Sequence, residues 1–271
     1  MEEDQLIGED VKIWKSILIW PILSQAYGTI LVLLTKPIPM LELTVKESAG
    51  LSMLYASSVL GGAYLILYLL KKGLIKFLQA IFLLSLFMSS VISLSHLLAG
   101  IRYGNMISLL TSLTMIWLWN RPGTIGNLVK VIFAASTSYI ILSTFPESFI
   151  IILLGLLAIY DAYSVFKGPL GRIFSSLEIK EEVLSPFFVV HKGMGIGIGD
   201  LLLYSLAASF SARTLGFPLA LLPLSFLNIG ILISLELLIR RKSAFPGITI
   251  PIALWLPSFL LAWLTMPQTT I

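Results

Sequence analysis

Long apolar runs separated by short polar connections make up almost the whole chain. A helix needs about 20 apolar residues to cross the hydrocarbon core of a bilayer. Backbone groups must be satisfied internally there, and no run alternates as a barrel strand would, so helices are expected throughout. The pattern predicts an all-α polytopic membrane protein with nine transmembrane helices, at residues 16–35, 50–70, 74–99, 104–119, 125–145, 148–167, 194–212, 217–239 and 246–264.

The spans are expected to form a single membrane-embedded domain over residues 1–271. Its consecutive parts are a tail (1–15), spans one to five (16–145), spans six and seven with a long connection at 168–192 (146–212), and spans eight and nine (213–271). The long connection ends in the apolar run Phe-Phe-Val-Val (187–190). It is either a mobile connector or an edge that pairs with an extended substrate segment.

Composition supports the membrane assignment and excludes several kinds of site. The chain is 57% hydrophobic and only 12% charged, about half the charged fraction of a soluble domain. It has no cysteine and two histidines, so disulfides, thiolate metal sites and a histidine metal centre are excluded. Its basic residues do not cluster with aromatic residues, as a nucleic-acid surface would require. We therefore expect no metal, no cofactor and no nucleic-acid partner.

Basic residues fall mainly on one side of the predicted membrane domain. Of the 18 Lys and Arg residues, 13 lie on the side of the N-terminus, 4 on the opposite side, and one, Lys130, within the fifth span. Loops rich in Lys and Arg stay in the cytoplasm. We therefore expect a multi-pass protein of the cell membrane, with a cytoplasmic N-terminus and an external C-terminus.

Two of the four aspartates lie inside predicted spans. Asp161 is near the inner end of span six, and Asp200 is near the inner end of span seven. An ionisable residue inside a span costs roughly 2.5–3.5 kcal/mol on insertion scales, so it indicates function. Each aspartate lies about six residues from its cytoplasmic boundary, which is about 9 Å along a helix. Neighbouring antiparallel helices would place the two carboxylates at the same depth.

A pair of carboxylates at one depth has a specific chemistry. Two such groups held close together cannot both ionise at low cost, so one keeps a proton while the other stays charged. The charged member can take a proton from water, and the neutral member can hydrogen-bond the carbonyl oxygen under attack. Hydrolysis of a peptide bond needs these two roles and no cofactor.

Alternating glycines precede Asp200. Gly193, Gly195, Gly197 and Gly199 are poor helix formers, at roughly 1 kcal/mol each relative to Ala. They indicate either a seam where helices approach closely or irregular backbone that faces a cavity.

Both motifs resemble those of a known family. Tyr160-Asp161 and Gly197-Ile198-Gly199-Asp200 are similar to the paired motifs of the GxGD intramembrane aspartyl proteases, the presenilins and signal peptide peptidases. The stretch 197–205 and the nine-span topology with the N-terminus inside are presenilin-like. The resemblance implies an aspartic endopeptidase that cleaves transmembrane helices, with Asp161 and Asp200 catalytic. It also implies that Tyr160, Gly197 and Gly199 shape the site.

The family's third element is a Pro-Ala-Leu motif at the start of the last span. Its position matches Pro246-Gly247-Ile248, in which Ala and Leu are replaced, and Pro251 to Leu254 offers a second placement. The resemblance implies that a backbone interrupted by proline lies beside the two aspartates and contributes to substrate binding.

The remaining polar residues have simpler interpretations. His96 is expected to be packed or interfacial, and His191 to be interfacial. Glu236 and Arg240 are spaced to pair on one helix. Lys130 is expected to extend its amine to the interface. Tyr160 is either an interfacial aromatic or a hydrogen-bonding neighbour of the aspartates.

Two other functions remain open at this stage. Intramembrane carboxylates and glycine-broken helices also occur in proton-coupled secondary transporters, but no internal repeat links the two halves of this chain. Prepilin and preflagellin peptidases also use a GxGD aspartate, although Leu201-Leu202-Leu203 does not match their usual lysine-containing continuation. The expected partners are transmembrane-helix substrates and the lipid bilayer, and a homo-oligomer is left open.

Overall fold

The computed structural model describes residues 17–167, 187–191, 194–241 and 245–266. Within these ranges the chain forms nine α-helices and one two-stranded sheet. The elements are α2 (Ile19–Thr35), α3 (Val45–Lys71), α4 (Ile75–Leu97), α5 (Gly104–Leu118), α6 (Thr124–Thr144), α7 (Glu147–Phe166), β1 (Phe188–His191), β2 (Met194–Gly197), α10 (Ile198–Leu215), α11 (Leu221–Arg241) and α12 (Thr249–Leu264). The predicted tail and most of the connection at 168–192 lie outside the described residues.

The apolar pattern locates all nine helices to within a few residues, and the seventh span is where it is wrong. That span was expected to be helical over 194–212, but residues 194–197 form strand β2 and α10 begins at Ile198. The alternating glycines lower the helix propensity of this stretch, so that pairing with another strand can decide its conformation. β2 pairs antiparallel with β1, with Val189 opposite Ile196.

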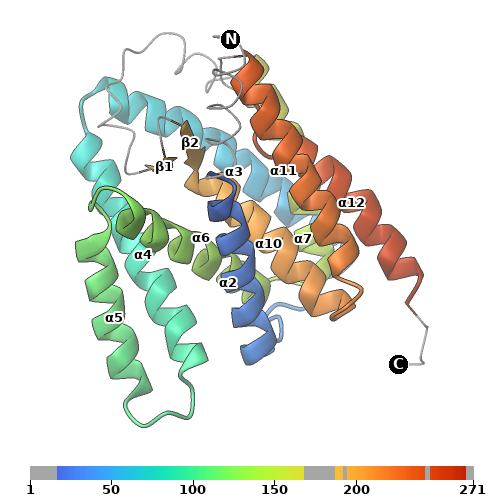
Figure 1. Ribbon diagram of the computed structural model, residues 1–271, viewed down its shortest axis with the longest axis horizontal. Coiled ribbons are helices and arrows are strands. Elements are labelled where there is room, and N and C mark those ends of the chain that lie inside the picture. The colour runs from blue at the N-terminus through green and yellow to red at the C-terminus, as the bar shows by residue number, and fades with distance from the viewer. Residues whose placement is uncertain (1–16, 168–186, 192–193, 242–244, 267–271) are drawn as a thin grey trace, which may run out of the picture.

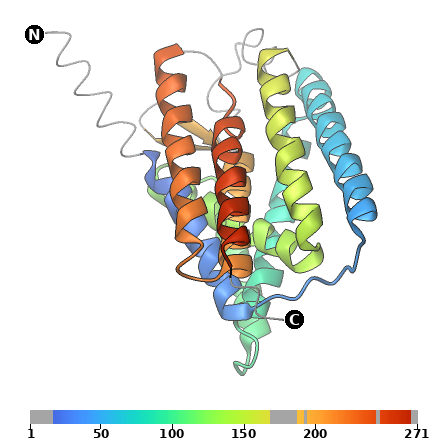
Figure 2. The same ribbon diagram turned by 90° about the vertical axis from the view of Figure 1, so that its right-hand side faces the viewer.

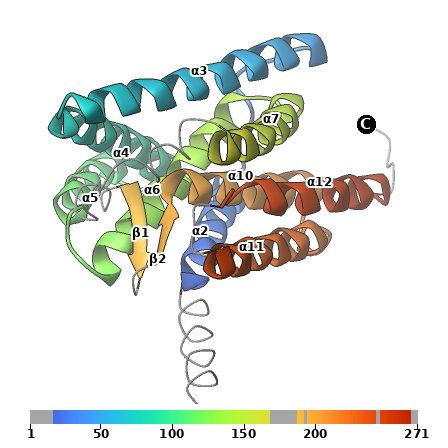
Figure 3. The same ribbon diagram turned by 90° about the horizontal axis from the view of Figure 1, so that it is seen from above.

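Five of the helices are long and apolar enough to cross a membrane, namely α3, α4, α6, α7 and α11, while α2, α5 and α12 are shorter apolar helices. The remaining helix, α10, carries three buried serines and Asp200. It lies in the middle of the bundle, where it packs on α2 and α6 and touches α11 and α12 (Figures 1 and 3). Because other helices surround it, α10 can carry polar residues that lipid would not tolerate.

The helix that carries Asp161, α7, belongs to a different part of the bundle. It packs on α3 and α12, and α12 packs in turn on α11 (Figure 2). α7 and α10 make little direct contact with each other, so the sequence-based picture of two adjacent helices is incomplete. The first turn of α12 lies between them.

Polar side chains join the central helices at depth. The Ser24 hydroxyl donates to Leu201 O at 3.0 Å, and the Ser205 hydroxyl donates to Ser24 O at 3.0 Å. The amides of Gln25 and Asn228 pair across α2 and α11, at 3.0 and 3.2 Å. Such bonds hold helices together where burial of apolar surface gives little driving force.

Gly230 allows α11 and α12 to approach closely. A Cβ at this position would collide with the Pro251 Cα atom and would lie 2.9 Å from the Pro251 nitrogen. Gly230→Ala should therefore lower stability by roughly 1–3 kcal/mol, because backbone cannot move aside as a flexible side chain can. Thermal unfolding in detergent measures this change. Gly155→Ala is the control, since its added methyl would meet no atom within 4 Å beyond the backbone of its own helix and its chain neighbours. Unchanged stability of Gly230→Ala would contradict the packing.

The predicted orientation can be tested because the chain has no cysteine. Ile101 lies in the exposed turn between α4 and α5, and Asn120 lies in the turn between α5 and α6. In intact cells, a membrane-impermeant maleimide should label Ile101→Cys, while Asn120→Cys should react only after permeabilisation. The opposite pattern would mean that the N-terminus is outside.

Candidate active site

Asp161 lies near the end of α7 and accepts hydrogen bonds from the first turn of α12. Its Oδ2 atom receives the Ile248 N–H at 2.8 Å, the Thr249 N–H at 3.3 Å and the Thr249 hydroxyl at 3.3 Å. The first N–H groups of a helix have no partner within the helix. A carboxylate from another helix therefore caps α12, and the pairing keeps Asp161 in place although only 7% of it is exposed.

Asp200 lies in the first turn of α10 and is half-buried. Its carboxylate accepts a hydrogen bond from the Gly197 N–H, at the N-cap of its own helix. This is the reciprocal half of a capping box, in which an acidic residue at the third helical position binds the N-cap amide. The sequence Gly-Ile-Gly-Asp thus caps α10 by itself and fixes the direction of the Asp200 side chain.

The two carboxylates meet at the backbone that leads into α12. A Cβ built on Gly247 would lie 2.7 Å from Asp200 Oδ2 and 3.0 Å from its Cγ atom. The next residue, Ile248, donates its N–H to Asp161. The two aspartates therefore border consecutive residues of one segment and are close enough to interact electrostatically.

Two further residues hold this segment, and sequence reasoning did not single them out. The Tyr204 hydroxyl donates to Gly247 O at 2.7 Å, from a side chain that is 3% exposed. Thr249 donates its N–H to Asp161, and its hydroxyl also lies 2.9 Å from Ala158 O. Tyr204 lies four residues after Asp200, so both face the same side of the helix. This spacing could have identified Tyr204 from the sequence as a site residue.

The other predicted site residues lie at differing distances from the carboxylates. Pro246 is buried directly before the segment that borders both aspartates. A Cβ on Gly197 would lie 3.4 Å from Asp200 Oδ2, whereas one on Gly199 would meet no atom within 4 Å. Tyr160 packs at the edge of the core, with its hydroxyl 3.4 Å from the Ser164 hydroxyl on its own helix.

The interpretation of Lys130 as an interfacial residue was wrong. Lys130 is 7% exposed, and its amine donates to Phe188 O on β1 at 2.7 Å. Asn127, one turn earlier on α6, donates its side-chain amide to Val190 O at 2.8 Å. The α6 helix thus binds the β1 side of the hairpin, and bound carbonyl groups compensate for the burial of the amine.

The remaining polar residues lie in structural pairs. The His96 ring nitrogen Nδ1 lies 3.0 Å from the Tyr139 hydroxyl, as expected for a packed histidine. His191 ends β1 opposite Met194. The expected pair of Glu236 and Arg240 forms at 2.6 Å.

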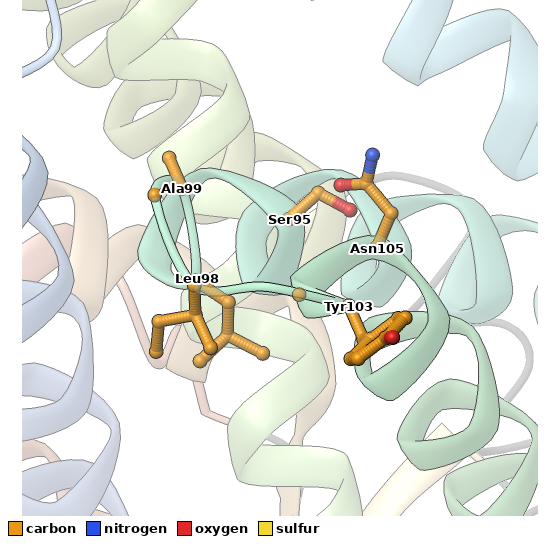
Figure 4. A pocket seen from close by; sticks show the side chains of 8 residues that line it. Ser95, Leu98, Ala99, Tyr103 and Asn105 are labelled. Atoms are coloured by element: carbon orange, nitrogen blue, oxygen red, sulfur yellow. The ribbon is translucent and has the colours of Figure 1, made fainter.

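A surface hollow at the turn between α4 and α5 is lined by Ser95, Leu98, Ala99, Gly100, Ile101, Tyr103, Gly104 and Asn105 (Figure 4). These lining residues include no acidic or basic side chain. Across the part of the chain that the structure describes, no three His, Cys, Asp or Glu side chains gather closely enough to hold a metal ion.

Comparison with solved structures shows a fold already known. The chain is similar to the structure of a presenilin family intramembrane aspartate protease in space group C222, with a TM-score of 0.65 and 17% sequence identity, over 93% of this chain and 98% of that one. The structure in space group P2 gives a TM-score of 0.64 and 19% identity, over 93% and 97% of the two chains. No family model and no curated protein matches the sequence. The chain therefore has a presenilin-type fold over nearly its whole length.

Proposed function

We propose that this protein is an intramembrane aspartyl protease, an endopeptidase that hydrolyses peptide bonds within transmembrane helices, with Asp161 and Asp200 as its catalytic pair. The observation that carries the proposal is the meeting of both carboxylates at Gly247 and Ile248. This meeting occurs within apolar helices, in a chain with the fold of known intramembrane aspartate proteases.

The pair supplies both proton transfers that amide hydrolysis needs. One aspartate, as carboxylate, removes a proton from a water molecule while the water oxygen bonds to the scissile carbonyl carbon. The other, as carboxylic acid, hydrogen-bonds the carbonyl oxygen as it gains negative charge. Collapse of the tetrahedral intermediate breaks the C–N bond, and the amine leaves with a proton from the pair. The products are a carboxylic acid and an amine, and the pair returns to its starting proton count.

The hairpin offers a place for the substrate to unwind. The carbonyls of Phe188 and Val190 point towards α6. The backbone hydrogen bonds between β1 and β2 must therefore form at the other two residue pairs of the register. Gly195 and Gly197, which face Val190 and Phe188 in the register, then turn their backbone groups away from β1. A substrate segment could add as a third strand along this edge, three residues before Asp200.

The proposed substrates follow from this position. Asp161 lies near the C-terminal end of α7, and Asp200 lies near the start of α10. Under the predicted orientation, both of these helix ends lie in the cytoplasmic half of the bilayer. We expect substrate helices with their N-terminus outside, cleaved in their cytoplasmic half. Substrate helices would reach the site from the lipid bilayer, and the proposal holds for a monomer or a homo-oligomer.

Asp161→Asn and Asp200→Asn should each abolish cleavage of a labelled transmembrane peptide in reconstituted vesicles. An amide cannot exchange the proton that a carboxyl group exchanges, although it fills the same space. Thermal unfolding should show that both variants stay folded. Substantial proteolysis by either variant would exclude that aspartate from the reaction.

Gly247→Ala should lower kcat by about 100-fold, because a misplacement of about 1 Å near the reacting groups has that effect. The added methyl would displace the Asp200 carboxylate or the start of α12. Gly155→Ala, with open space around its added methyl, is the matched control for a loss of activity unrelated to the site. Wild-type kcat in Gly247→Ala would show that the contact between Gly247 and Asp200 does not shape the active site.

A further inference from the structure

Two buried polar side chains of α6 bind the backbone of the hairpin. Asn127 and Lys130 are 4% and 7% exposed and lie three residues apart, so they face the same side of α6. The carbonyls that they bind, of Val190 and Phe188, are two residues apart and therefore point to the same side of β1. The two side chains on the helix therefore reach the two carbonyls on the strand, and the hairpin is attached to α6 at two points.

This attachment has a high physical cost if it serves packing alone. An amine or an amide buried among membrane helices is unfavourable unless it is hydrogen-bonded. The Lys130 amine also lies 6.0 Å from the centre of the Trp119 ring, at the C-terminal end of α5, and this adds a cation–π contact. Two apolar side chains at these positions would fill the same space without the cost of removing polar groups from water. They would, however, leave the β1 carbonyls that face α6 without a hydrogen-bond donor.

The attachment decides which edge of the hairpin is open and where that edge lies. Among the residues that the structure describes, one edge of β1 is bound to β2 and the other to α6, which leaves the β2 edge for a further strand. β2 runs directly into α10, with Asp200 three residues after Gly197. A hairpin released from α6 could pivot about its junction with α10, which would change the direction of the open edge relative to the carboxylates.

We propose that Lys130 and Asn127 are positioning residues, which hold the hairpin so that an added substrate strand meets Asp200 in a single register. This proposal rests on the proposed protease function. It predicts that the two side chains affect the choice of scissile bond as well as the rate, since they act through the hairpin and touch no reacting atom.

The test uses the full-length protein and the variants Lys130→Met and Asn127→Leu, which remove the donors at similar size. Hydrogen exchange in detergent should be about tenfold faster for the hairpin amides of 188–191 and 194–197, as expected for the loss of a buried hydrogen bond. Mass spectrometry of a cleaved transmembrane peptide should show additional cleavage positions and a higher KM. Lys130→Arg keeps a donor and should restore much of the wild-type cleavage pattern. Ser138→Ala, whose hydroxyl binds only carbonyls of α6 itself, is the control and should change neither readout.

The outcomes separate this proposal from the proposed function. Wild-type cleavage positions and KM in both variants would overturn the role in positioning. If the wild-type protein cleaves no peptide, the proposed function fails. Independently of cleavage, unchanged hydrogen exchange of the hairpin amides in both variants would show that the two side chains do not hold the hairpin. If Lys130→Met does not fold, Asn127→Leu alone decides, because its replacement introduces no buried charge and removes none.

Discussion

The free N–H groups at the start of α12 are the constraint on which the site depends. In the apolar interior of a helix bundle these N–H groups need a hydrogen-bond acceptor, and here a protein group supplies it. The Asp161 carboxylate accepts hydrogen bonds from two of these N–H groups and from the hydroxyl of Thr249. A buried carboxylate and an uncapped helix would each be unfavourable alone, and each satisfies the other.

The remaining geometry of the site follows from this pairing. With Ile248 bound to Asp161, Gly247 lies against the Asp200 carboxylate and its carbonyl oxygen receives the Tyr204 hydroxyl. The start of α12 thereby connects α7 and α10, which make little contact of their own. A structural requirement of membrane helices, the satisfaction of helix ends, thus brings two acids from separate parts of the bundle to one place.

Hydropathy was sufficient to predict the nine helices, because each must cross or fill an apolar region of fixed thickness. The sequence also predicted that Asp161 lies near the C-terminal end of its helix and Asp200 near the N-terminal end of its own, since these positions depend only on residue count. Strand β2 was missed because 194–197 is apolar enough to extend a span. Only the low helix propensity of its alternating glycines indicated otherwise.

Contacts between helices distant in sequence were beyond such reasoning. Nothing in the composition of α6 indicates that Lys130 binds Phe188 O, because a lysine near a span end ordinarily reaches water. The identity of the segment between the aspartates was suggested by family resemblance and by the depth of Pro246. The need for a residue without a side chain at Gly247 became visible only when the Asp200 carboxylate was in place.

Cleavage of peptide bonds within the membrane by the two carboxylates can be measured by incubating the purified protein in vesicles with a labelled transmembrane peptide and identifying the fragments by mass spectrometry. The incubation is repeated with a peptide-like compound that carries a hydroxyl in place of the attacked carbonyl, and with a chelator. We expect cleavage inside the apolar stretch, which the hydroxyl compound blocks and the chelator leaves unchanged. Intact peptide with proton-coupled solute uptake, or cleavage that the chelator abolishes, would contradict it.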